Sequence, residues 1–205
     1  MNGLIIANGV LPPFHIIRSL HSSCDIVVCA DGGANHAKRL RITPDIILGD
    51  LDSITSATKK YFSAIPILHI TDQNSTDLEK AITFCIQRNI TTANVVGALG
   101  KRIDHATNSL GCFKRFRNAI LLRMYDVNGL LTLIDKSADI PTRNGQKISL
   151  IPLDRCIGVT TKHLKYELKN STLELGAREG ISNEATSSSV SISVKKGTLL
   201  LYQCY

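Results

Sequence analysis

The stretch Asp45-Ile46-Ile47-Leu48-Gly49-Asp50-Leu51-Asp52-Ser53 joins a short apolar run to two carboxylates that stand one residue apart at its exit. A short apolar run bounded by turn residues is typical of a buried strand in a parallel sheet. Two ionised carboxylates about 4 Å apart repel by about 4 kcal/mol at an effective dielectric constant of ~20. A metal ion, a cationic ligand or a shared proton usually relieves such a pair. The alternative is that Asp50 and Asp52 cap the helix that follows.

The same combination of an apolar run and an acid recurs through the first half of the chain. The acids that follow the other apolar runs are Asp31, Asp72, Asp77 and Asp104. In an open parallel sheet, ligands bind outside the carboxyl ends of the strands, near the point where the strand order reverses. We therefore expect these loops to converge on one crevice.

Up to about Met124, short apolar runs alternate with helical segments, which predicts an α/β domain built on a parallel sheet. The predicted strands are 4–7, 26–30, 46–49, 67–70, 94–97 and 120–122. One helix is predicted to start near Thr76, with Ser75 or Thr76 as its cap, and another to run from about Asp104 to Phe116.

After Met124 the helical period fades, and short strand-like runs predict an antiparallel β-sandwich or barrel. These runs are 130–134, 147–151, 157–160, 164–168, 190–194 and 198–202, and residues 176–189 are predicted to be a polar loop. The chain is therefore divided into an α/β domain, residues 1–124, and a β domain, residues 125–205.

Composition narrows the classes of partner. The 205 residues are 43% hydrophobic, enough for a substantial core, and the formal charge of +7 is spread over short basic groups with only 5% aromatic residues. Without a basic stripe or a stacking platform, no nucleic-acid partner is expected. Six cysteines without a CxxC pair indicate reduced thiols, and no secretory signal or membrane span is recognisable, so we expect a cytoplasmic protein without a membrane partner.

Several motifs, in this order and spacing, resemble the thiamine pyrophosphokinase family. They are Ala30-Asp31-Gly32-Gly33, Gly49-Asp50-Leu51-Asp52-Ser53-Ile54, Asp72 to Ile82, Gly97 to His105, Gly158-Val159-Thr160-Thr161 and Gly180-Ile181-Ser182-Asn183-Glu184. The resemblance implies an N-terminal α/β domain, a C-terminal β-sandwich and a homodimer that holds thiamine between the α/β domain of one subunit and the sandwich of the other. It also implies a Mg²⁺-dependent kinase that transfers the pyrophosphoryl group of ATP to the hydroxyl of thiamine, which yields thiamine diphosphate and AMP.

Phosphoryl-type transfer depends on positioning and on charge neutralisation, so carboxylates with a metal ion and a few basic groups suffice. The carboxylates predicted to act jointly in catalysis and in Mg²⁺ binding are Asp50, Asp52, Asp77 and Asp104. The residues predicted to bind ATP are Asp31, Gly32, Gly33, Gln73, Lys80, Lys101 and Arg102. Ser182 and Asn183 resemble the family's thiamine-contacting loop.

Some of these assignments have alternatives. Lys80 could equally lie on the helix surface, and Gly32 and Gly33 could simply form the turn after a strand. Lys101 stands where the family commonly has a glycine, which would strain the backbone if that position needs a positive φ. His163 also replaces a common glycine, and His36 is predicted to lie on the surface.

Two other functions remain open from the residues alone. A metal-dependent phosphohydrolase would use the same carboxylates without an acceptor, and a nucleic-acid-binding module would use the basic balance and the β-rich second half. A dinucleotide-binding domain is disfavoured because no GxGxxG follows the first strand.

Overall fold

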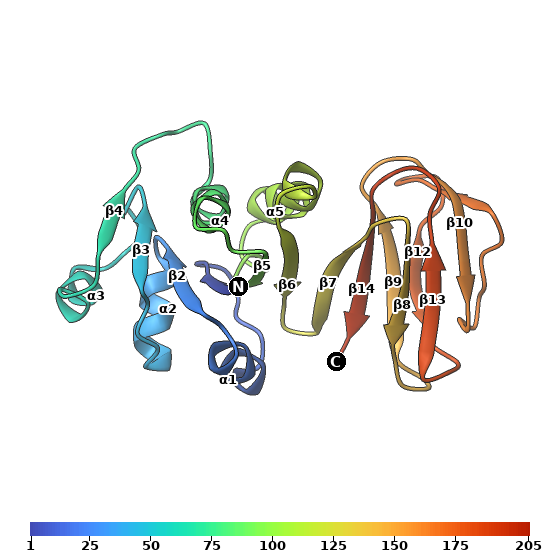
Figure 1. Cartoon of the computed structure of the whole chain (residues 1–205), viewed down its shortest axis with the longest axis horizontal. Coiled ribbons are helices and arrows are strands. Elements are labelled where there is room, and N and C mark those ends of the chain that lie inside the picture. The colour runs from blue at the N-terminus through green and yellow to red at the C-terminus, as the bar shows by residue number, and fades with distance from the viewer. The chain divides into compact units, whose positions relative to one another are not determined.

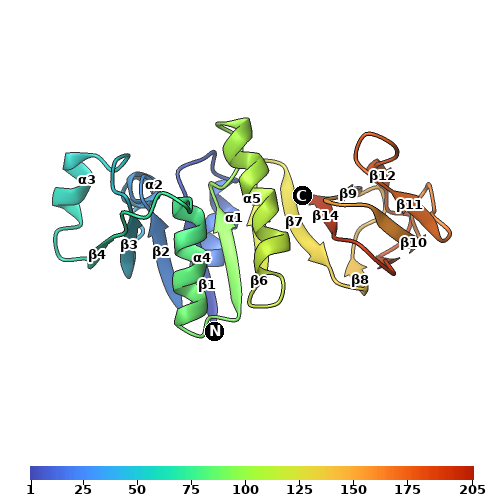
Figure 2. The ribbon, with the colours of Figure 1, turned by 90° about the horizontal axis from the view of Figure 1, so that it is seen from above.

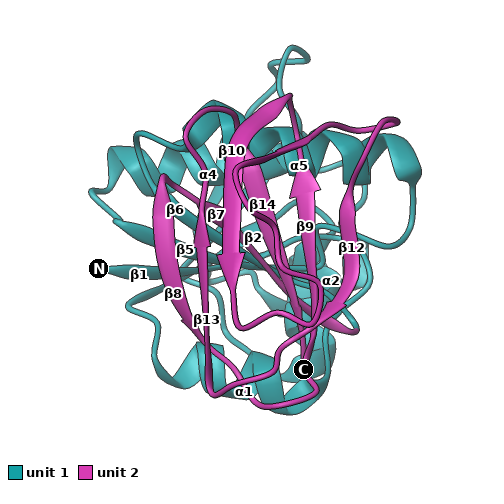
Figure 3. Ribbon diagram, turned by 90° about the vertical axis from the view of Figure 1, so that its right-hand side faces the viewer, with its two compact units in different colours: residues 1–127 teal, residues 128–205 magenta.

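A computed structural model describes residues 1–205, which form two compact units, Met1–Val127 and Asn128–Tyr205 (Figure 3). Each unit has its own hydrophobic core. The two units are described in turn.

Unit 1 alternates strands with helices along its whole length (Figure 1). Its strands are β1 (Asn2–Ile6), β2 (Ile26–Ala30), β3 (Ile46–Gly49), β4 (Ile67–His69), β5 (Thr92–Val96) and β6 (Leu121–Tyr125). Its helices are α1 (Phe14–Ser22), α2 (Gly33–Leu40), α3 (Ser56–Tyr61), α4 (Asp77–Gln87) and α5 (Ile103–Phe116). The predicted α/β fold is confirmed, with small shifts at the strand ends.

The six strands pair in parallel in the order β6-β5-β1-β2-β3-β4, so the strand order reverses between β1 and β5. Parallel crossovers are right-handed, so connections that run in opposite directions along a sheet place their helices on opposite faces. Accordingly, α1 and α2 cover one face, and α4 and α5 cover the other (Figures 1 and 2). Covered on both faces, Leu4, Ile5 and Ile6 of β1 are completely buried.

The start of α4 is set by Thr76, which the sequence offered as one of two caps. The Thr76 side chain accepts a hydrogen bond from the Glu79 backbone N–H, and the Glu79 carboxylate accepts one from the Thr76 backbone N–H at 2.8 Å. This reciprocal capping box satisfies N–H groups that would otherwise be unpaired. It fixes where α4 begins beside the carboxyl end of the sheet.

Unit 2 is an antiparallel β-sandwich. Its strands are β7 (Gly129–Ile134), β8 (Ser137–Pro141), β9 (Lys147–Pro152), β10 (Cys156–Lys162), β11 (Ser171–Leu173), β12 (Gly180–Glu184), β13 (Ser189–Ser193) and β14 (Leu199–Cys204). Within the unit, β12-β9-β14-β7 form one layer and β11-β10-β13-β8 form the other. Buried side chains from both layers make up one core.

Two predictions for unit 2 were wrong. Residues 164–168 form no strand beyond an isolated bridge at Leu164; the run looked strand-like because Leu164 and Leu168 are buried in the core. Residues 180–184, placed in a polar loop, form β12 at the edge of its layer, where most side chains need not be apolar.

None of the helices is both long and apolar enough to cross a membrane.

Candidate active site

A cavity of about 560 Å³ opens at the carboxyl ends of the parallel strands in unit 1. Its lining includes residues 7–9 and 97–99, from the two loops at the reversal of strand order, the β1 loop (residues 7–10) and the β5 loop (residues 97–100). The Gly9 N–H donates to the Gly97 carbonyl at 2.5 Å, and the Val10 N–H donates to the Leu99 carbonyl at 2.8 Å. The cavity thus lies where open α/β sheets bind their ligands.

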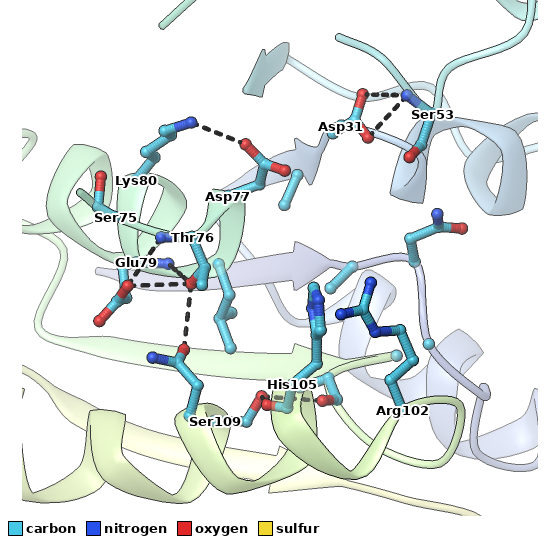
Figure 4. A pocket seen from close by; sticks show the side chains of 18 of the residues that line it. Asp31, Ser53, Ser75, Thr76, Asp77, Glu79, Lys80, Arg102, His105 and Ser109 are labelled. Carbon is cyan, nitrogen blue, oxygen red and sulfur yellow. Dashed lines mark hydrogen bonds and ion pairs between the residues drawn. The ribbon is translucent and has the colours of Figure 1, made fainter. Parts of the chain in front are cut away.

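Three carboxylates form an acidic trio at this cavity: Asp31 after β2, Asp50 after β3 and Asp77 at the start of α4. Each offers one carboxylate oxygen, and these oxygens lie within 4.8 Å of one another. Figure 4 shows the Asp31 carboxylate held by the Ser53 backbone N–H, at 3.2 and 3.3 Å. Burial raises the pKa of Asp31, and the charges of Asp77 and Asp52 add to the effect. A cation between the three would relieve this repulsion.

Backbone geometry at the end of β3 brings the trio together. Gly49 has a φ of +143°, and a Cβ there would lie 2.8 Å from Asp77 Oδ1 and 2.9 Å from Asp31 Cβ. A side chain at this position would therefore displace the acids. The Asp50 N–H also donates to Asp77 Oδ1 at 3.2 Å, which ties the end of β3 to α4.

Lys80 belongs to the site. Its Nζ lies 3.1 Å from Asp77 Oδ1, and only 6% of the residue is exposed. The alternative that Lys80 lies on the helix surface is therefore wrong. Its positive charge offsets one of the three negative charges of the acidic trio.

The structure leaves two of the predicted carboxylates outside the trio. Asp52 is exposed and accepts a hydrogen bond from the Ser53 hydroxyl at 2.8 Å. Asp104 is exposed and forms an ion pair with Arg102, in which Arg102 Nε donates at 3.1 Å. This hydrogen-bonded partner lowers the pKa of Asp104 to about 2. Asp104 is thus a charged neighbour of Arg102 rather than a member of the trio.

The basic side chains Lys101 and Arg102 line the cavity next to the first turn of α5, and Gln73 also lines it. Lys101 is not among the residues with a positive φ, whereas Gly100 has a φ of +95°. Lysine therefore fits without backbone strain where the family commonly has glycine. Its Nζ donates to Asn8 Oδ1 at 3.4 Å.

Gly32 and Gly33 serve the turn between β2 and α2. A Cβ at Gly32 would lie 2.3 Å from the Asn8 side chain, and one at Gly33 would lie 1.9 Å from the Ile6 carbonyl oxygen. Neither glycine is among the residues that line the cavity. The geometry favours the interpretation that these glycines let α2 pack closely against β1.

In unit 2, Ser182 and Asn183 lie on β12 with different surroundings. Ser182 is exposed at a φ of +57°, beside a register shift between β12 and β9. Asn183 is 8% exposed; its Oδ1 accepts from the Tyr166 N–H at 3.1 Å, and its Nδ2 donates to the Tyr166 carbonyl at 2.8 Å. Ser182 is thus open to a ligand, whereas the Asn183 amide holds residues 164–168 in place.

Comparison with known proteins connects this geometry to a family. A family model described as "Thiamin pyrophosphokinase, catalytic domain" matches residues 17–122, and one described as "Thiamin pyrophosphokinase, vitamin B1 binding domain" matches residues 132–199. The chain belongs to the thiamine pyrophosphokinase family. It is therefore an enzyme that transfers the pyrophosphoryl group of ATP to thiamine.

Full-length relatives of the thiamine pyrophosphokinase family match over most of the chain. Thiamine pyrophosphokinase 1 of Oryza sativa subsp. japonica is 29% identical, over 93% of this chain and 82% of the relative. Thiamin pyrophosphokinase 1 of Caenorhabditis elegans is 32% identical, over 80% of this chain and 72% of the relative.

Solved structures share the fold. Thiamine pyrophosphokinase from Bacillus subtilis superposes with a TM-score of 0.87 at 23% identity, covering 100% of this chain and 99% of that one. Thiamin pyrophosphokinase from Candida albicans superposes with a TM-score of 0.90 at 21% identity, covering 100% of this chain and 89% of that one.

The cavity is also lined by residues that the sequence analysis missed. Asn8 lies two residues after the end of β1, close to the position that Asp31 and Asp50 have after β2 and β3, so its position was a usable signal. Arg115 of α5 forms an ion pair with the buried Glu79 of α4. No sequence signal marks that pair, because only the packing of α4 beside α5 joins the two residues.

His36 was wrongly placed on the surface. It is 8% exposed and lies against the β1 loop, with Nε2 3.0 Å from the Gly9 carbonyl oxygen. Burial lowers the pKa of His36, and the neighbouring charge of Arg39 adds to the effect. The imidazole is therefore neutral at neutral pH.

Proposed function

We propose that ATP binds in the cavity of unit 1 with its phosphates at the acidic trio, and that Asp31, Asp50 and Asp77 hold Mg²⁺ there. The supporting observation is that three carboxylate oxygens lie within 4.8 Å of one another with one lysine to balance them. Mg²⁺ prefers such oxygen ligands, keeps several waters and is commonly shared with substrate phosphates. The donor set therefore fits this ion. When bound, Mg²⁺ would neutralise charge on the phosphate oxygens.

In this proposal, Lys101 and Arg102 hold the phosphates beside the N-terminus of α5. Arg102 can grip two phosphate oxygens, and the positive end of the helix dipole favours the same charge. Because Arg102 is paired with Asp104 in the free enzyme, the arrival of phosphate would draw the guanidinium away and release the carboxylate. Gln73, which also lines the cavity, would contact the nucleotide, while Gly32 and Gly33 would act only by letting α2 pack against β1.

The reaction then requires one bond to form and one to break. The hydroxyl oxygen of thiamine attacks the β-phosphorus of ATP, and the bond from that phosphorus to the oxygen bridging to the α-phosphate breaks, so AMP leaves. A carboxylate of the set Asp50, Asp52, Asp77 and Asp104 accepts the hydroxyl proton. Positioning and electrostatics supply the catalysis, with no covalent intermediate.

We propose that thiamine binds between the α/β domain (residues 1–124) of one subunit and the β-sandwich (residues 125–205) of the other in a homodimer. Ser182 is exposed on β12, next to Ile181, which is 67% exposed. Ile103, at the start of α5, is 84% exposed. In this proposal, the partner subunit covers these two apolar side chains. Ser182 would contact the aminopyrimidine, and Asn183 would support it by holding residues 164–168.

We also propose that the enzyme works in the cytoplasm, without a nucleic-acid or membrane partner. All six cysteines are free, and Cys29, Cys85, Cys112 and Cys156 are buried, as suits a reducing compartment. Fractionation of cells that produce the tagged chain tests the location.

The central experiment incubates the purified chain with thiamine, ATP and Mg²⁺. AMP and thiamine diphosphate should form in equal amounts, and Asp50→Asn or Asp77→Asn should lower turnover at least about 100-fold. Asp45→Asn is a matched control, because Asp45 lies at the other end of β3. Its carboxylate accepts a hydrogen bond from the Val27 N–H at 2.7 Å, and an asparagine oxygen can accept the same bond. ADP as the stoichiometric product would exclude pyrophosphoryl transfer. ATP loss that does not depend on thiamine would favour the phosphohydrolase.

A further inference from the structure

His36 connects α2 to the β1 loop, which lines the cavity, without lining the cavity itself. Its Nδ1 lies 2.6 Å from Arg39 Nη2, and its Nε2 lies 3.0 Å from the Gly9 carbonyl oxygen. A guanidinium only donates, so Nδ1 is the acceptor and Nε2 carries the proton. The imidazole therefore donates to the β1 loop, and Arg39 fixes the tautomer that makes this possible.

The β1 loop is held on its other sides as well. The Gly9 N–H donates to the Gly97 carbonyl at 2.5 Å, and a Cβ at Gly9 would lie 2.3 Å from that carbonyl oxygen. The Asn8 side chain packs above Gly32 and accepts a hydrogen bond from Lys101 Nζ. Because there is so little free space, a small shift of Gly9 would move Asn8, the hydrogen-bond partner of Lys101.

We propose that His36 is a positioning residue for the nucleotide: through its hydrogen bond to Gly9 it holds the β1 loop, and so Asn8 and Lys101, in the geometry that binds ATP. This inference rests on the proposed ATP site. The acidic trio is supported separately, by Gly49, Ser53 and Lys80. Loss of the His36 bond should therefore weaken ATP binding and leave the chemical step largely unchanged.

Two substitutions at His36 separate this role from a merely structural one. In His36→Gln the side-chain amide reaches the position of Nε2 and can still donate to Gly9. In His36→Asn the amide reaches only the position of Nδ1, so the contact toward Arg39 is kept and the bond to Gly9 is lost. We expect His36→Asn to raise the KM for ATP about 3- to 10-fold, the worth of one hydrogen bond, with kcat and the KM for thiamine changed less than about 2-fold. His36→Gln should recover most of the ATP affinity.

Calorimetric titration with Mg²⁺ and an ATP analogue that cannot be cleaved should give Kd values whose ratio, variant to wild type, equals the ratio of the KM values for ATP. Equal ATP affinity in the two variants, or a fall in Tm with no change in the KM for ATP, would overturn the proposal. If His36→Asn fails to fold, Arg39→Ala tests the same point at an exposed position, since loss of the partner of Nδ1 should also raise the KM for ATP. A wild-type chain that forms no thiamine diphosphate would count against the proposed function. The ratios of KM and Kd between the His36 variants and the wild type test only the role of His36.

Discussion

Replacement of Asp31 by asparagine should make the metal-free protein more stable while it removes the response to Mg²⁺. Asparagine has almost the same shape as aspartate, and its side-chain oxygen can still accept a hydrogen bond from the Ser53 N–H, which lies 3.2 Å from Oδ2 of Asp31. The substitution therefore removes one negative charge from the acidic trio with little change in packing. Stability and function should move in opposite directions, because the negative charges that repel one another in the metal-free protein are the same charges that attract the cation.

The magnitude follows from the geometry of the trio. Charges separated by the 4.8 Å that bounds these oxygens repel by about 3 kcal/mol per pair at an effective dielectric constant of ~20. The ammonium of Lys80, 3.1 Å from Asp77, offsets part of this, and the raised pKa of Asp31 reduces its charge. We expect a net gain of about 1–2 kcal/mol for Asp31→Asn, a rise in Tm of roughly 3–6 °C.

Thermal unfolding in EDTA, and then in Mg²⁺ with an uncleavable ATP analogue, measures both effects. Saturating ligand should stabilise the wild type by about 2.7 kcal/mol at 100 times its Kd, and most of this should vanish in Asp31→Asn. Asp45→Asn, with the same charge change at the far end of β3, should keep the response to Mg²⁺. The reasoning fails if Asp31→Asn is less stable than the wild type in EDTA, or if Mg²⁺ raises both Tm values equally.

Three further predictions concern backbone strain, β12 and pH. Gly49→Ala should lower the free energy of unfolding in urea by about 1–3 kcal/mol, because the added Cβ would lie 2.8 Å from a carboxylate oxygen of the trio. Gly111→Ala, in an open helical position, is the control and should raise it by about 0.5–1 kcal/mol. Similar effects of the two substitutions would contradict the geometry. Asn183→Ala should lower stability by about 2 kcal/mol, while Ser182→Ala should leave stability within about 0.5 kcal/mol and raise the KM for thiamine; an unchanged KM would remove Ser182 from the thiamine site. The folded-state pKa of His36 lies below its unfolded value, so stability should fall as the pH drops from above 6.5 toward the folded pKa, and His36→Gln should flatten that part of the curve; parallel curves would show that another group titrates there.

Local patterns in the sequence were sufficient for the α/β unit. The apolar runs that end at Ala30 and Gly49 are strands, and Thr76 caps α4, because buried parallel strands and helix caps leave clear local signals. The convergence of Asp31, Asp50 and Asp77 follows from the rule for carboxyl ends of parallel strands. The strands of the β-sandwich were harder to predict, because its short edge strands carry few apolar side chains. For example, β12 lies in a polar segment.

The sequence by itself determined the fold class, the family and the edge of the sheet at which acids gather, since each depends on residue order and local periodicity. Only the tertiary structure decided that Lys80 and His36 are buried, that Asp104 pairs with Arg102, and that Leu164 lies in a core without belonging to a strand. The reason is physical: a polar side chain is buried where a distant part of the chain supplies its hydrogen-bond partner, and no local pattern records that partner.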